Sequence, residues 1–236
     1  MKKAVGFDQK ILLKHLDYTL QETNNSTMNE MYGKLNEFLL PDIQGEKSRK
    51  NAITMLMKIW YRVGDGIKPL QQEALSHFND INSEQRFIYH WMMSLLAYPF
   101  LRDIATEIGR LSKIQDEFSG SQLMRKIKDI YGDRRRVEVA VNAVITTLKK
   151  WNAIENARNK LLYRTKPKRT IEDIRLKQWL VHAVLVSTDI KYMELELISK
   201  EPYLFPFDIK LHPGVPDKLK FNIQVLGVNK LMVGLK

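Results

Sequence analysis

The sequence predicts a mainly α protein with a helical N-terminal domain, a helical central domain and a small α/β C-terminal tail that ends in a hairpin. Apolar residues recur every three to four positions along most of the chain, which is the spacing of amphipathic helices. Alternating apolar runs, which indicate strands, are short and lie near 154–163 and at the C-terminal end. With 236 residues and a hydrophobic content of 44%, the chain can bury a core. We expect three parts: 1–82, 83–170 and 171–236.

Four short helices are expected in the N-terminal domain. The first falls within 7–23, where apolar residues repeat on one helical face. The second covers 27–40, where Thr27 can supply the N-terminal cap and a proline follows the last residue. Two more are expected over 49–63 and 69–78, separated by a glycine-rich turn.

The central domain opens with the most apolar helix of the chain, over 87–98. Such a helix is normally buried on all sides. Pro99 should end it, and a further helix is expected over 100–115. Its inward-facing residues are predicted to be Ile104, Ile108, Leu111 and Ile114.

Two helices and a ribbon should follow. Ser121 can cap a helix over 122–131, and a Gly-Asp turn leads into a long helix over 134–151. Two short strands, 154–157 and 161–163, are joined by a polar turn.

The C-terminal region should contain one helix and one hairpin. The helix is expected over 171–186, ended by the polar residues up to Asp189. Residues 190–199 fit either a helix or an alternating strand. After a proline-rich loop, strands over 220–226 and 231–235 flank a turn at 227–230.

The positive charge of the chain is concentrated in one stretch. Residues 121–170 contain fourteen Lys and Arg against four Asp and Glu, which accounts for +10 of the whole-chain charge of +11. A local excess of this size indicates a polyanionic partner rather than general solubility. Three arginines at the start of a helix also oppose the helix dipole, by about 0.3–1 kcal/mol for each exposed charge, so a nearby anion would stabilise them.

The helix over 134–151 has two chemically different faces. At 100° per residue, Val137, Val141 and Leu148 fall on one broad apolar face. The opposite face carries side chains that can pair with base edges or hold phosphates. These are Arg135, Val139, Asn142, Thr146, Lys149 and Lys150.

This order of helix, helix, turn, helix and two-stranded ribbon resembles that of winged-helix DNA-binding proteins over about residues 99–169. The passage from Leu148 through Trp151 to Ile154 is similar to the exit of their third helix into the first wing strand. The resemblance implies that the N-terminal half of the long helix enters the major groove and that the ribbon is a wing. The expected DNA-binding residues are Arg134, Arg135, Arg136, Val139, Asn142, Thr146, Lys149, Lys150, Arg158, Lys160, Arg164, Lys166, Lys168 and Arg169.

Catalytic, metal and cofactor sites are not expected. The five histidines are scattered singly, cysteine is absent, and the glycines lack the spacing of a phosphate-binding loop. The lack of cysteine fits a reducing compartment, so the expected location is the cytoplasm. No apolar run reaches the roughly 20 residues of a membrane span, so no membrane partner is expected.

The sequence therefore predicts a non-catalytic protein that binds double-stranded DNA through a winged helix. Because no ligand-sensing domain is evident and the helices offer apolar surface, we expect an accessory subunit that works with other protein subunits in a larger DNA-acting complex. The layout also loosely resembles small accessory proteins of bacterial BREX-type phage-defence operons. Two alternatives remain: a transcriptional regulator, and a structural scaffold whose winged helix binds protein.

Overall fold

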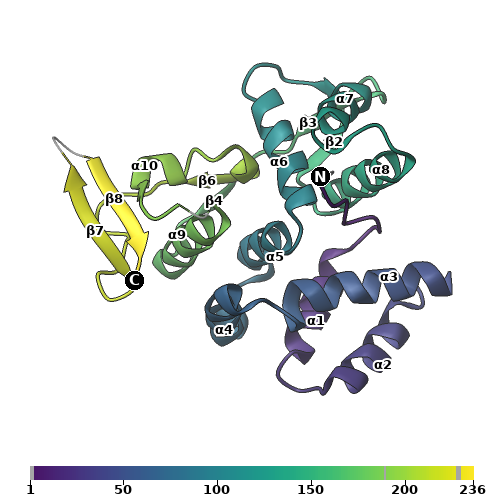
Figure 1. Ribbon diagram of the computed structural model, residues 1–236, viewed down its shortest axis with the longest axis horizontal. Helices are drawn as coiled ribbons and strands as arrows, with labels where there is room; N and C mark the ends of the chain where they lie inside the picture. The colour runs from purple at the N-terminus through teal and green to yellow at the C-terminus, as the bar shows by residue number, and fades with distance from the viewer. Residues whose placement is uncertain (1–2, 189, 227–229) are drawn as a thin grey trace.

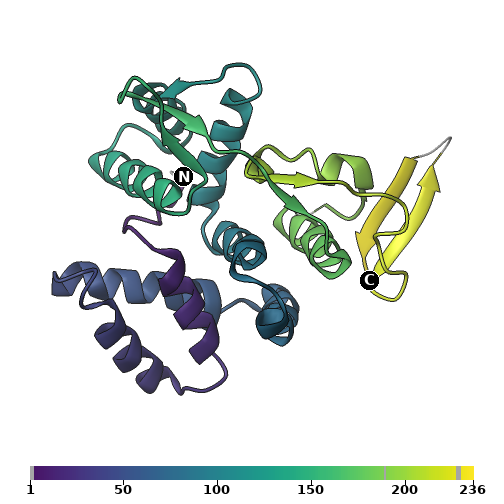
Figure 2. The same ribbon diagram turned by 180° about the vertical axis from the view of Figure 1, so that it is seen from behind.

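The computed structural model describes residues 3–188, 190–226 and 230–236. Helices dominate and the sheets are small, so the mainly α prediction is confirmed. Helix α5 (Ser83–Ala97) lies in the middle of the molecule, with the N-terminal helices, the central helices and the C-terminal helix arranged around it (Figures 1 and 2). The nearly complete burial of its apolar residues agrees with the expectation of a fully enclosed helix.

The N-terminal group contains the four helices expected from the sequence. Thr27 caps the second, because its hydroxyl oxygen accepts from the Glu30 N–H while the Glu30 carboxylate accepts from the Thr27 N–H at 2.8 Å. The third helix begins three residues earlier than expected and continues as a π-helical turn, Met57–Tyr61. The four helices are α1 (Leu13–Glu22), α2 (Met28–Leu39), α3 (Glu46–Leu56) and α4 (Lys68–His77).

The predicted helix over 7–23 is wrong in its first third, because α1 begins only at Leu13. Phe7 has a φ of 61°, which no helix residue can adopt. Its ring is 1% exposed and packs edge-on against Tyr98 and Trp151, at centroid distances of 5.5 and 6.1 Å. Burial of this ring between distant parts of the chain therefore outweighs the local helical pattern, and residues 3–12 form an irregular segment.

The central group contains three helices and a three-stranded antiparallel sheet in the order β1-β3-β2. Ser119, not Ser121, caps the second helix by accepting from the Gln122 N–H at 3.0 Å. Ile114 was expected to face inward, but the helix before it ends at Leu111 and leaves Ile114 79% exposed. The elements are α6 (Pro99–Leu111), β1 (Phe118–Ser119), α7 (Gly120–Tyr131), α8 (Arg135–Lys150), β2 (Ile154–Asn156) and β3 (Leu162–Thr165).

The C-terminal group contains α9 (Ile174–Thr188) and two small sheets. The undecided stretch 190–199 uses both conformations, as strand β5 (Met193–Glu194) and helix α10 (Leu195–Ile198). The predicted hairpin is present as β7 (Phe221–Leu226) and β8 (Lys230–Leu235). Residues 227–229 of its turn lie outside the described residues, as does Asp189, which was expected to end the preceding helix. A parallel pair, β4 (Arg169–Ile171) with β6 (Phe207–Ile209), was not predicted.

The two three-stranded sheets share one topology. In each, a short strand precedes a helix and pairs with the second strand of a later hairpin, which gives the orders β1-β3-β2 and β5-β8-β7. The helix α8 between the first short strand and its hairpin has no counterpart in the second unit, where residues 199–219 contain only a 3₁₀ turn, Pro202–Leu204, and β6. Only the first unit therefore has a long helix between its short strand and its hairpin.

Four fully buried tryptophans join segments that are far apart in the sequence. Each is 0% exposed and donates its indole N–H to a group at least 30 positions away. Since an unpaired indole in a dry core would cost about 1–3 kcal/mol, these bonds fix the relative positions of the segments. The pairs are Trp60 to His90 Nδ1 (3.1 Å), Trp91 to the Tyr203 carbonyl (3.0 Å), Trp151 to the Ile11 carbonyl (3.0 Å) and Trp179 to the Leu70 carbonyl (2.9 Å).

We predict opposite effects from two glycine-to-alanine substitutions in helices. A Cβ at Gly109 of α6 would lie 1.9 Å from the Pro202 carbonyl oxygen, so Gly109→Ala should lower the free energy of unfolding by at least ~2 kcal/mol. A Cβ at Gly33 of α2 would meet no atom within 4 Å, so Gly33→Ala should raise it by about 0.5–1 kcal/mol. Urea unfolding of both variants measures this. Equal effects would contradict the close packing of α6 against the 3₁₀ turn.

A second prediction concerns pH. Buried His15 accepts from the Leu12 N–H at Nδ1 (3.2 Å) and donates from Nε2 to Asp42 (2.9 Å), so both ring nitrogens are used by the neutral form. Burial lowers the pKa of His15 below its ordinary 6.5 despite the opposing effect of Asp42. As pH falls below about 6.5, the unfolded chain takes up a proton that the folded chain does not, so stability should fall by up to ~1.4 kcal/mol per pH unit.

Unfolding of the wild type and His15→Gln between about pH 7.5 and pH 5.5 tests this, because the variant should lose part of the slope. His182, whose pKa burial also lowers, should contribute to the slope that remains in the variant. As a control, Asn24→Gln replaces an exposed side chain that does not titrate and should keep the wild-type slope. An unchanged slope in His15→Gln would contradict the assignment.

Candidate nucleic-acid interface

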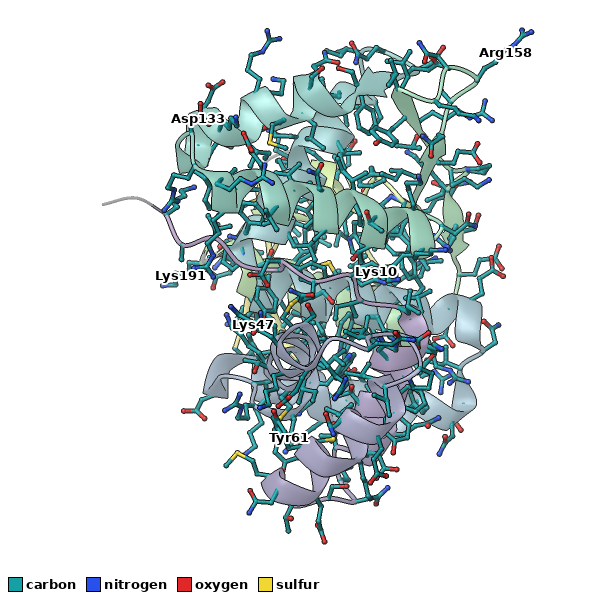
Figure 3. The ribbon with its side chains drawn as sticks, turned by 90° about the vertical axis from the view of Figure 1, so that its right-hand side faces the viewer. Lys10, Lys47, Tyr61, Asp133, Arg158 and Lys191 are labelled. Carbon is teal, nitrogen blue, oxygen red and sulfur yellow. The ribbon has the colours of Figure 1, made fainter. Side chains whose placement is uncertain are left out.

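Helix α8 lies at the surface with its predicted face uncovered. The apolar side chains of its inner face, which include Val137, Val141, Val144 and Leu148, are buried. Figure 3 turns α8 toward the viewer, between Asp133 before its start and the β2–β3 hairpin with Arg158. The predicted face is exposed at all six positions: Arg135, Val139, Asn142, Thr146, Lys149 and Lys150.

The irregular N-terminal segment runs along one edge of α8 rather than over this face. The Ile11 N–H donates to the Thr147 hydroxyl at 3.2 Å, and Asp8 lies 3.9 Å from Arg136. Both α8 residues are on the side next to the buried stripe. Arg136 is still 67% exposed, so it borders the predicted face while it contacts the segment.

Arg134 has a structural role that the sequence did not indicate. Its guanidinium donates to the Tyr131 carbonyl at 2.9 Å and to the Lys3 carbonyl at 3.1 Å. The first bond satisfies a carbonyl at the C-terminal end of α7, and the second holds the N-terminal segment. A contact between Arg134 and DNA remains a prediction, but these bonds direct the side chain inward.

Part of the positive charge at the start of α8 is balanced within the protein. Arg135 is 86% exposed and lies 3.2 Å from Glu138, which also accepts from Lys128 at 2.7 Å. The hydrogen bonds from Lys128 and then Arg135 hold the pKa of Glu138 below its ordinary value. An ionised Glu138 in the first turn therefore stabilises the helix dipole, and Arg135 retains donors that point to solvent.

The C-terminal half of the α8 face is less compensated. In the described parts of the chain, Lys149 and Lys150 form no ion pair, and the ammonium of Lys149 lies 5.9 Å from the ring centroid of Tyr163 in β3. The Thr146 hydroxyl donates to the Asn142 carbonyl at 2.8 Å, whereas the Asn142 amide makes no hydrogen bond to any described residue. Lysines at the end of a helix also match its dipole.

The β2–β3 hairpin carries exposed cations at its tip and carboxylate-paired cations at its base. Arg158 and Lys160 are exposed at the tip, where Arg158 projects away from the body (Figure 3). At the base, Arg164 and Lys166 both lie 2.7 Å from Glu155. The bonds from Lys166 and Arg164 lower the pKa of Glu155, so this carboxylate stays ionised and offsets the two basal cations.

Arg169 belongs to the interior junction rather than to the basic surface. Its guanidinium donates to the Trp151 carbonyl at 3.0 Å and lies 4.1 Å from the ring centroid of Phe87. Burial lowers the pKa of Arg169 from its ordinary value. Its neighbour Lys168 is exposed and makes no ion pair with any described residue, so the basic track continues through Lys168 only.

A second basic surface was missed at the sequence level. Residues 47–64 contain five Lys and Arg and no Asp or Glu. Averaging the charge over all residues outside 121–170 concealed this stretch, because acidic residues elsewhere cancel it. A sliding charge window of one helix length would have revealed it.

Other kinds of site find no support in the described residues. They contain no group of three His, Cys, Asp or Glu side chains that could hold a metal ion. None of the helices in these ranges is long and apolar enough to cross a membrane. No family model, curated protein or solved structure matches the chain.

The inward hydrogen bonds of Arg134 generate a stability prediction. Arg134→Ala should lower the free energy of unfolding by about 1–3 kcal/mol, because two carbonyls lose a charged donor. Arg135→Ala, one residue away and facing solvent, should change it by no more than ~0.5 kcal/mol. Thermal or urea unfolding compares the two. A larger loss for Arg135→Ala would contradict the division of roles.

Proposed function

We propose that residues 99–165 form a winged helix that binds double-stranded DNA without catalysing a reaction. In this proposal α8 is the recognition helix and the β2–β3 hairpin is the wing. The order α6, β1, α7, α8, β2, β3 and the sheet order β1-β3-β2 support it, since they provide a long helix beside a projecting hairpin.

The exposed face of α8 is the observation that carries the proposal. Arg135 and Asn142 have free donors of the kinds that pair with guanine and adenine edges in the major groove. Lys149 and Lys150 extend beyond them, pair with no carboxylate among the described residues, and are suited to phosphates. Val139 lies between the polar positions and is 45% exposed, which allows an apolar contact with a thymine methyl group.

The remaining predicted residues divide into contacting and supporting groups. In the proposal, Arg158, Lys160 and Lys168 contact the DNA backbone, because they are exposed and unpaired among the described residues. Arg134 and Arg169 position the binding surface through their bonds to backbone carbonyls. Arg136, Arg164 and Lys166 are available to DNA when their carboxylate partners release them.

We infer that the protein acts as an accessory subunit rather than as an isolated regulator. Three apolar side chains in its C-terminal region are exposed to solvent: Leu219 is 83% exposed, Val225 68% and Leu226 52%. These residues belong to the hairpin region at the opposite end of the molecule from α8 (Figure 1). Exposed apolar side chains in one region favour a protein partner, which could bind there while α8 holds DNA. A role in phage defence rests on the sequence resemblance alone.

A scaffold that binds protein through α8 is the competing function, and DNA binding distinguishes the two. We predict that the wild type binds a random-sequence duplex with an affinity that falls steeply with salt, by about 0.9 in log–log slope for each phosphate neutralised. The triple variant Arg135→Ala, Lys149→Ala, Lys150→Ala should bind at least ~10-fold more weakly and with a smaller slope.

Fluorescence anisotropy over a salt series measures both quantities, with single-stranded DNA as competitor. A triple variant of three exposed lysines in the C-terminal region, Lys210→Ala, Lys218→Ala, Lys230→Ala, is the matched control and should bind like the wild type. Absence of salt-dependent duplex binding by the wild type would reject the function in favour of the scaffold.

A further inference from the structure

The stretch 47–64 covers α3 after its first residue, together with the π-helical continuation Met57–Tyr61. Its cations lie outside the surface proposed above for DNA binding. The structure divides them by role. Arg49 is 8% exposed and donates to Asn36, to the Ile43 carbonyl and to the Gln44 carbonyl at 2.8–2.9 Å, so it holds the loop before α3. Lys50 pairs with Glu46 at 2.6 Å. Lys47, Lys58 and Arg62 are exposed and form no ion pair with any described residue.

The unpaired lysines belong to one polar stripe. Lys47, Asn51, Thr54 and Lys58 follow one another at intervals of four, three and four residues, which places them on one side of a helix. All four are exposed, while Ile53 and Leu56 on the other side are fully buried. The stripe spans about 16 Å at the rise of an α-helix. It contains no carboxylate.

This stripe borders a groove that it shares with the start of α8. The groove has a volume of about 350 Å³ and is lined by Asn51, Thr54 and Lys58 on one side and by Arg136 of α8 on the other. The Lys58 ammonium lies 4.5 Å from the ring centroid of Tyr98 in the groove. In Figure 3, α3 is seen nearly end-on below α8, with Lys47 at its near end.

The charge of the groove lining is positive. Asp8 is the one carboxylate among the lining residues, and it already lies 3.9 Å from Arg136. A small anion would need one enclosed cluster of donors, whereas these donors are spread along a helix and open to solvent. A chain of regularly spaced phosphates fits such a stripe, since each strand of a duplex advances about 3.4 Å per phosphate along the axis.

We propose that the α3 stripe is a second phosphate-binding surface, and that the backbone of a duplex bound at α8 continues across the groove onto Lys47, Asn51, Thr54 and Lys58. This inference rests on the proposed function and extends it from the central group to the N-terminal helices. The two surfaces are both held by α5. Trp60, in the π-helical continuation of α3, donates to His90 of α5 at 3.1 Å, and Trp151 at the end of α8 packs against Phe87 and Trp91 of α5. Full binding affinity then requires a duplex longer than the length that α8 alone covers.

Duplex length provides the test. The double variant Lys47→Ala, Lys58→Ala should bind a duplex of about two helical turns (~20 base pairs) ~10-fold more weakly than the wild type and with a log–log salt slope smaller by about 2. On a duplex of about one turn (~10 base pairs), which α8 alone occupies, the variant should match the wild type within about two-fold. Both lysines are exposed, so circular dichroism should confirm an unchanged fold.

The control is Lys210→Ala, Lys218→Ala, which removes two exposed lysines from the C-terminal region and should leave binding of the longer duplex unchanged. If the double variant Lys47→Ala, Lys58→Ala binds the longer duplex with the affinity and salt slope of the wild type, the inference is overturned. The proposed function would still stand if the α8 triple variant loses affinity. An equal loss in the control would also overturn the inference. Failure of the wild type to bind either duplex would reject both proposals.

Discussion

The indole N–H of Trp151 donates to the carbonyl of Ile11, 3.0 Å away, at the point where α8 ends. Its ring also meets Phe7, Phe87 and Trp91 at centroid distances of 6.1 Å, and its own carbonyl accepts from Arg169. The N-terminal segment, α5, α8 and β4 therefore converge on one fully buried residue. Removing this side chain would leave a large cavity together with an unpaired Ile11 carbonyl.

This convergence determines which surfaces are free. Because the N-terminal segment is held at the edge of α8 by Ile11 and Thr147, the face from Arg135 to Lys150 stays open to solvent. The same segment places α3 beside the start of α8, so that two basic helices border one groove. The rigid interior thus generates a basic surface composed of parts that lie about 80 residues apart in the sequence, whereas the apolar C-terminal hairpin lies at the other end.

Local patterns predicted the features that depend on local physics. The two faces of α8, the Thr27 cap and the final hairpin follow from periodicity and capping chemistry, and all are present. The irregular segment 3–12 and the parallel β4–β6 pair depend on contacts between distant residues, so periodicity could not reveal them. Charge counting likewise grouped Arg134 and Arg169 with the exposed cations, because it takes no account of the tertiary structure that brings the Lys3 and Trp151 carbonyls to their guanidinium groups.

Photo-crosslinking tests the central claim, that duplex DNA lies on the exposed face of α8, most directly. Val139, 45% exposed in the middle of that face, would be replaced by p-benzoyl-phenylalanine and irradiated in the presence of labelled duplex. Val225, 68% exposed in the C-terminal hairpin, is the matched position at the opposite end of the molecule. The account predicts a protein–DNA crosslink from position 139 and none from position 225. A crosslink from 225 without one from 139 would contradict it.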